Sequence, residues 1–104
     1  MANSEEFLSF LIDQCSGAGH LSARAMFGAY TLYMDGKILG IVGDGQFFLR
    51  ATPAGLRLLP DAPLMPPYPG AKACILVEEL EDREFLTALL QAVWPELPEK
   101  KKRK

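Results

Sequence analysis

The sequence has few of the residues that build covalent or metal-centred scaffolds. Its 104 residues include two cysteines, Cys15 and Cys74, and one histidine, His20. Small secreted domains rely on more disulfide bonds than two cysteines allow, and zinc sites need ligands at a closer and more regular spacing. We therefore expect a reducing, cytoplasmic setting, two buried free thiols and no bound metal.

The sequence also lacks the patterns of membrane insertion and of common enzyme classes. No apolar run approaches the roughly 20 residues that cross a bilayer, and the acidic start of the chain differs from a secretory signal. The glycine-rich segment 40–45 has no lysine for a phosphate group, and no GxSxG motif is present. Cys15 lies in an apolar helical pattern, which argues against a nucleophilic pair with His20. We expect no catalytic residue, no cofactor and no membrane association.

A run of basic residues ends the chain and leaves the rest acidic. Residues 1–99 contain thirteen acidic and six basic residues, a net charge of −7. The five residues that follow are all basic: Lys100, Lys101, Lys102, Arg103 and Lys104. Such a tail contacts phosphates without reading a sequence, but an acidic body disfavours nucleic acid. We interpret 99–104 as a disordered, solubilising tail on one domain, 1–98, and keep phosphate contact by the five basic residues as the alternative.

Helical patterns are present near both ends of the domain and in its middle. Apolar residues at helical spacing predict helices over 4–15 and 81–94. Thr52 followed by Pro53 is typical of an N-cap and a first helical position, so a short helix is predicted there. The segment 60–70 holds five of the eight prolines, which predicts an extended loop.

The segment between the first two helices is typical of an antiparallel meander. Two Asp-Gly pairs, at 35–36 and 44–45, are the strongest short-range signal for hairpin turns. They separate three runs rich in strand-forming residues: 25–34, 37–43 and 46–50. A further strand is predicted over 72–77. The pattern α-βββ-α-β-α is that of a two-layer α+β domain, with an antiparallel sheet and helices on one face.

Two sequence stretches resemble a known family. The stretches are RAMFGAYTLYMDG over 24–36 and IVGDGQFFLR over 41–50, followed by Pro-Tyr-Pro at 67–69. They are similar to the N-terminal domain of the TfoX/Sxy family, whose pattern is R-x-M-F-G-G-Y-G-[LI]-Y-x-[DN]-G and then A-D-G-x-[LF]-[YF]-[LF]-[KR]. The resemblance extends over about 5–95, and this chain departs from the pattern with Ala29 and Thr31, where glycine or another small residue is usual.

The resemblance implies a fold like that of small secretion chaperones, a capacity to dimerise and a role linked to regulators of natural competence. In the family, this domain is joined to a helical C-terminal domain of the helix-hairpin-helix kind, which has no counterpart in the sequence. We therefore expect a stand-alone, non-enzymatic regulatory or adaptor domain. It would act as a homodimer or through a protein partner in transcription regulation.

The expected contact surface is rich in aromatic residues. Phe47 and Phe48 are neighbours in a predicted strand, so they must point to opposite faces, and one of them faces away from the helices. A dimer or partner interface explains this better than base stacking, because few basic residues are nearby. The residues expected to form or support the surface are Arg24, Met26, Phe27, Gly28, Tyr30, Tyr33, Phe48 and Arg50.

Two alternatives from other functional classes remain open. The first is a weak nucleic-acid binder that uses the basic tail and the sheet aromatics. The second is a small enzyme or ligand binder with a pocket near Tyr68, Arg24 and Cys74. Arg24 and Arg50 are expected to form ion pairs with acidic residues of the domain itself, or else to orient a partner's carboxylate.

Overall fold

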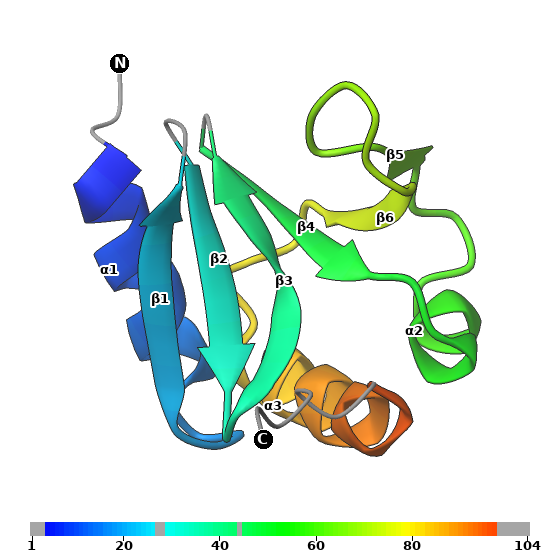
Figure 1. Cartoon of the computed structure of the whole chain (residues 1–104). Coiled ribbons are helices and arrows are strands. Elements are labelled where there is room, and N and C mark those ends of the chain that lie inside the picture. Colours follow the sequence, from blue (N-terminus) through cyan, green and yellow to red (C-terminus); the bar gives the residue numbers. More distant parts are fainter. Residues whose placement is uncertain (1–3, 27–28, 44, 98–104) are drawn as a thin grey trace, which may run out of the picture.

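The computed structural model describes residues 4–26, 29–43 and 45–97. Within these ranges a six-stranded antiparallel sheet, in the order β1-β2-β3-β4-β6-β5, is covered by helices on one face (Figure 1). The elements are α1 (Ser4–Cys15), β1 (Leu21–Met26), β2 (Ala29–Met34), β3 (Lys37–Gly43), β4 (Gln46–Arg50), α2 (Pro53–Leu58), β5 (Leu64–Met65), β6 (Cys74–Val77), α3 (Arg83–Val93) and the 3-10 helix η1 (Trp94–Glu96). The predicted α+β class is confirmed.

The meander contains one strand more than the sequence pattern predicted. The run 25–34, expected to be a single strand, is divided between β1 and β2, which pair as an antiparallel hairpin with Met26 opposite Ala29. Ala23 and Ala25 give β1 low strand propensity, so its start at Leu21 carried little signal. The observed order is therefore α-ββββ-α-ββ-α, and residues 27–28, between β1 and β2, lie outside the described residues.

The proline-rich segment also contains a strand that was not predicted. β5 lies within the segment 60–70 and pairs with β6, so that Leu64 is opposite Ile75 and Met65 is opposite Cys74. A strand of two residues at the edge of a sheet leaves almost no periodic pattern in a sequence. The rest of the segment is loop, as predicted.

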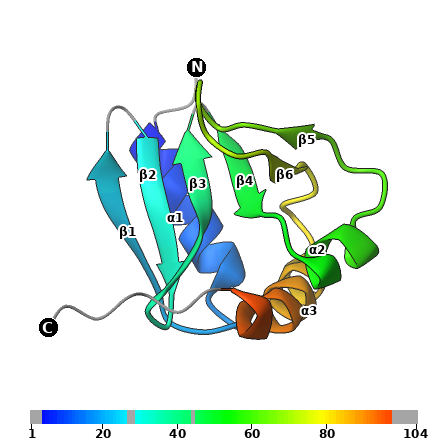
Figure 2. The ribbon, with the colours of Figure 1, turned by 45° about the vertical axis from the view of Figure 1, so that its right-hand side comes forward.

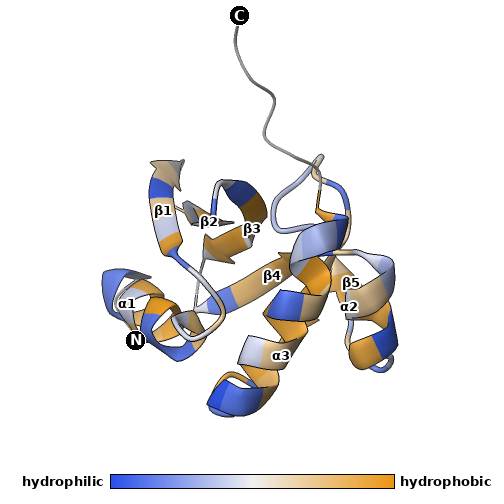
Figure 3. Cartoon of the chain, turned by 90° about the horizontal axis from the view of Figure 1, so that it is seen from below, coloured by the Kyte–Doolittle hydropathy of each residue, from blue (hydrophilic) through white to orange (hydrophobic). Residues whose placement is uncertain are grey.

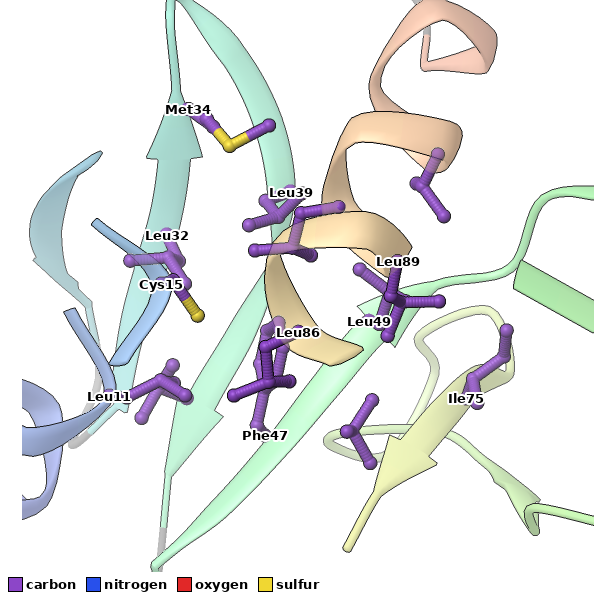
Figure 4. Packing of buried hydrophobic residues seen from close by; sticks show 14 of the residues in the cluster. Leu11, Cys15, Leu32, Met34, Leu39, Phe47, Leu49, Ile75, Leu86 and Leu89 are labelled. Atoms are coloured by element: carbon purple, nitrogen blue, oxygen red, sulfur yellow. The ribbon is translucent and has the colours of Figure 1, made fainter. Parts of the chain in front are cut away.

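The main core lies between the sheet and the helices α1 and α3. Leu11 of α1 and Leu86 and Leu89 of α3 are fully buried in one cluster with the strand residues Phe47 and Ile75 (Figure 4). The buried residues of α3, Leu86, Leu89, Leu90 and Val93, recur at helical spacing and form one apolar face, while polar residues occupy other positions (Figure 3). None of the described helices is long and apolar enough to cross a bilayer.

Local chemistry fixes the predicted turns and the start of α2. Asp35 and Gly36 both have positive φ, +48° and +87°, as a hairpin of the Asp-Gly type requires. At the start of α2, the Thr52 hydroxyl oxygen accepts a hydrogen bond of 3.1 Å from the Gly55 N–H. A Glu96 carboxylate oxygen accepts another, of 2.8 Å, from the Ala54 N–H, which ties this helix start to η1.

Candidate functional site

A second, smaller apolar cluster lies on the sheet face opposite α1 and α3. It consists of Phe48, Cys74 and Leu76, which are buried, with Ile41 packed against them. Phe47, the neighbour of Phe48 in β4, belongs to the main core on the helix side. The prediction that the two rings point to opposite faces is therefore confirmed.

The structure brings only some of the predicted surface residues onto this face. The cross-strand pairs place Arg24 opposite Thr31 and Phe48 opposite Ile41, while Tyr33 follows Thr31 by two residues. Arg24 is exposed, Tyr33 is half-buried and Phe48 is only 5% exposed. Tyr30 instead packs against the main core on the helix side.

Other predicted residues lie outside the described side chains or lack the expected partners. The structure does not describe the side chain of Met26, residues 27–28 or the basic tail 99–104. Among the described residues an ion pair joins Arg83 to Asp13, at 3.0 Å, and none involves Arg24 or Arg50. The predicted ion pairs of these two arginines are therefore absent from that part of the chain.

A cavity of about 620 Å³ opens on the same face of the sheet. One side is formed by β2, β3 and β4, and the other by the connection from β5 to β6, which runs in front of the sheet (Figure 2). Its lining residues are Thr31, Ile38, Gly40, Ile41, Arg50, Ala51, Pro67, Tyr68, Ala71, Lys72, Ala73 and Cys74. Tyr68 and Cys74 were predicted to lie near a pocket, and they do, whereas Arg24 is not in the lining.

The cavity is positively charged at one side. Arg50 and Lys72 are in its lining, and the lining contains no aspartate or glutamate. Cys74 is 8% exposed, and its thiol donates a hydrogen bond of 3.7 Å to the Lys72 carbonyl oxygen. Burial raises the pKa of the Cys74 thiol, and the nearby Arg50 charge opposes this shift.

A second surface feature is a set of exposed apolar side chains at one edge of the sheet. β5 is the last strand of the sheet, and α2 lies on the same side of the molecule, below β5 and joined to it by a connecting loop (Figures 1 and 2). The exposed fractions are 42% for Leu56, 38% for Leu58, 53% for Leu64, 39% for Met65 and 48% for Tyr68. We call these five residues the α2–β5 edge. This edge was not predicted, although the apolar pair Leu64–Met65 between prolines is a visible signal in the sequence.

The family model of the TfoX N-terminal domain matches residues 13–92, which is most of the chain. The chain belongs to the TfoX N-terminal domain family. It is also 31% identical over 105 residues to an "uncharacterized 12.7 kDa protein in trpE 5′ region" of Spirochaeta aurantia, a match that covers 100% of this chain and 91% of that protein. No solved structure matches it significantly.

The two cysteines of this TfoX N-terminal domain are both free and buried, as predicted. Cys15 is fully buried between α1 and the sheet, and this burial raises the pKa of its thiol to about 12, partly opposed by the charge of Arg83. His20 is exposed, and its backbone exchanges hydrogen bonds with Asp35. No group of three or more potential metal ligands gathers within the described ranges.

Proposed function

We propose that this TfoX N-terminal domain is a non-enzymatic regulatory or adaptor module of a competence-related type that acts as a homodimer. Membership of the family supports the regulatory role. The observation that carries the proposed dimer is the α2–β5 edge, where five large apolar side chains are 38–53% exposed. Several large apolar side chains left exposed on a small domain are typical of an interaction surface.

The position of the α2–β5 edge in the fold favours a second copy of the chain as its partner. β5 ends the sheet, so its outer backbone groups have no neighbouring strand among the described residues. Such an edge invites pairing with another strand, and a two-fold axis at this place would bring β5 of each copy against the other. The apolar side chains of α2 would then be covered at the same interface.

Phe48 was expected to form or to support the contact surface, and we propose that it has the supporting role. With 5% exposure, Phe48 has too little free surface to contact a partner directly, so it supports the strands from within. Tyr33 and Arg24 lie on the same face, nearer the opposite end of the sheet. We propose them as a secondary contact for a protein partner of the dimer.

The solution mass of the protein over a concentration series tests the proposed dimer. We expect a species of twice the 11.5 kDa chain mass, and a monomer for the variant Leu64→Glu, because a charge cannot be buried unpaired at an apolar interface. Phe10→Glu is the matched control: Phe10 lies on α1 and is 41% exposed, yet it is not part of the α2–β5 edge. It should leave the dimer intact.

Two results would contradict the proposal. A monomer at every concentration would exclude self-association. A dimer that survives Leu64→Glu but dissociates in Phe10→Glu would place the interface on α1 instead of at the α2–β5 edge.

A further inference from the structure

The cavity between the sheet and the β5–β6 connection has the size and the composition of a ligand site. Its volume of about 620 Å³ lies within the range of roughly 300–1,000 Å³ that is usual for small-molecule pockets. Ile38 and Ile41 of β3 supply apolar surface, and Pro67 and Ala71 supply more from the connection. Thr31 and Tyr68 are residues with a polar group in the same lining.

Residues 1–99 are acidic overall, and two of the few basic residues among them line the cavity. Only six of the residues in 1–99 are basic, against thirteen acidic ones. Two of the six, Arg50 and Lys72, line the cavity, and no carboxylate accompanies them there. Elsewhere in the fold, Arg83 pairs with Asp13, and Lys37 donates to the carbonyl oxygen of Trp94.

The side chains of Arg50 and Lys72 have no hydrogen-bond or ion-pair partner within the described part of the chain. Arg50 is half-buried, at the end of β4 and opposite Cys74 across the strands. A guanidinium held beside an apolar cavity without a carboxylate is arranged to receive an oxyanion, because charge-assisted hydrogen bonds of this kind are among the strongest.

We propose that the cavity binds a small amphipathic anion, whose carboxylate or phosphate group lies between Arg50 and Lys72 and whose apolar part covers the β3 side of the cavity. The apolar walls favour a hydrocarbon or aromatic body, and the two cations select the charged head. A neutral molecule of the same shape would gain only the apolar contact. The cavity shares Tyr68 with the α2–β5 edge, but Arg50 and Lys72 are not part of that edge, so the proposed binding does not depend on the dimer.

The experiment is a fluorescence titration of the full-length protein with two dyes that share an aromatic body. 1-Anilinonaphthalene-8-sulfonate carries an anionic group, and N-phenyl-1-naphthylamine is its neutral counterpart. We expect saturable binding of one anionic dye per chain. Arg50→Gln and Lys72→Gln should each weaken that binding about tenfold, the loss expected when one charge-assisted hydrogen bond is removed.

The controls separate charge recognition from damage to the fold. Arg57→Gln removes an exposed cation of α2 that is not in the cavity lining, and it should leave binding of the anionic dye unchanged. The neutral dye should bind all variants alike. The dimer-deficient Leu64→Glu chain should bind the anionic dye as the unmodified chain does, so failure of the dimer and failure of the site are distinguishable.

Competition then identifies the head group. Octanoate and octyl phosphate should both displace the anionic dye. The one that displaces it at the lower concentration carries the preferred head group. Octan-1-ol, which has no charge, should not displace it. The proposal is overturned if the anionic dye does not saturate at one per chain. It is equally overturned if Arg50→Gln has no effect, or if it weakens both dyes in parallel.

Discussion

The ammonium group of Lys37 lies 4.0 Å from the centre of the Trp94 ring and donates a hydrogen bond of 3.2 Å to the carbonyl oxygen of the same residue. Lys37 is only 9% exposed, so this contact satisfies a nearly buried charge. The indole Nε1 of Trp94 in turn donates a hydrogen bond of 2.6 Å to the Met34 carbonyl oxygen. Together these contacts hold the end of α3 against the hairpin of β2 and β3.

The variant Trp94→Phe should lower the free energy of unfolding by about 1–3 kcal/mol, because the Met34 carbonyl oxygen loses its donor while an aromatic ring remains. Urea denaturation followed by far-ultraviolet circular dichroism measures the change. Tyr68→Phe, which removes a polar group from a side chain 48% exposed, is the control and should change stability by less than about 0.5 kcal/mol. Equal effects of the two variants would contradict the role given to the indole N–H.

Gly40 should tolerate no side chain, because a Cβ atom there would collide with the backbone carbonyl oxygen of Phe48. Backbone atoms of a central strand cannot move aside cheaply, so we expect Gly40→Ala to cost about 3 kcal/mol or more. Gly45→Ala is the control: its Cβ would meet nothing within 4 Å, and its φ of +69° adds only the strain of a left-handed residue, about 1–2 kcal/mol. Thermal unfolding of both variants decides between them, and a milder effect at Gly40 would contradict the close approach.

Signals confined to a few neighbouring residues were predictable from the sequence. Thr52 and Pro53 identify the start of α2, and Asp35–Gly36 identifies a hairpin turn, because capping and positive φ depend on residue type at fixed positions. The helix α1 was predicted with its observed bounds, since its apolar positions repeat at helical spacing.

Features that depend on the register between strands were not predictable. In the pairing of β2 with β3, Leu32 is opposite Gly40 and Tyr33 is opposite Ile38, so Leu39 is an extra residue in a bulge. Nothing in the local sequence requires this bulge. The orientation of Tyr30 is a different case: it was expected on the same surface as Tyr33 and Phe48, but alternation within β2 already places positions 30 and 33 on opposite faces, and Tyr30 packs toward the helices.

The cavity was predictable only in part. Tyr68 and Cys74 were expected near a pocket, but its cationic side depends on how the β5–β6 connection folds back over the sheet. That path brings Lys72 close to the end of β4, far away in sequence. The contact of Lys37 with Trp94 spans 57 residues and likewise left no local pattern.

The attachment of α1 to the segment that leads into α3 should depend on Gln14 more than on the ion pair beside it. Gln14 is 8% exposed, and its Nε2 donates a hydrogen bond of 2.8 Å to the Leu80 carbonyl oxygen. The neighbouring pair of Arg83 and Asp13 is exposed, with side chains 53% and 71% accessible. We expect Gln14→Ala to cost about 1–2 kcal/mol and Asp13→Ala less than about 0.5 kcal/mol, measured by urea denaturation. The reverse order would mean that the surface ion pair holds the helices together.

The buried thiol of Cys15 should make the fold sensitive to alkaline pH. Its pKa rises from 9.0 to about 12 on folding, so the folded state holds the proton more tightly than the unfolded chain does. The resulting stabilisation is complete below about pH 9 and is lost as the pH rises toward 12, at up to about 1.4 kcal/mol per pH unit.

Urea denaturation at pH 8, 9, 10 and 11, values chosen to cover this window, should show a steeper loss of stability in the unmodified chain than in Cys15→Ala. Cys74→Ala is the matched variant at the second thiol, where burial also raises the pKa and the nearby charge of Arg50 opposes this shift. Parallel pH profiles for the unmodified chain and Cys15→Ala would show that the Cys15 thiol titrates alike in both states.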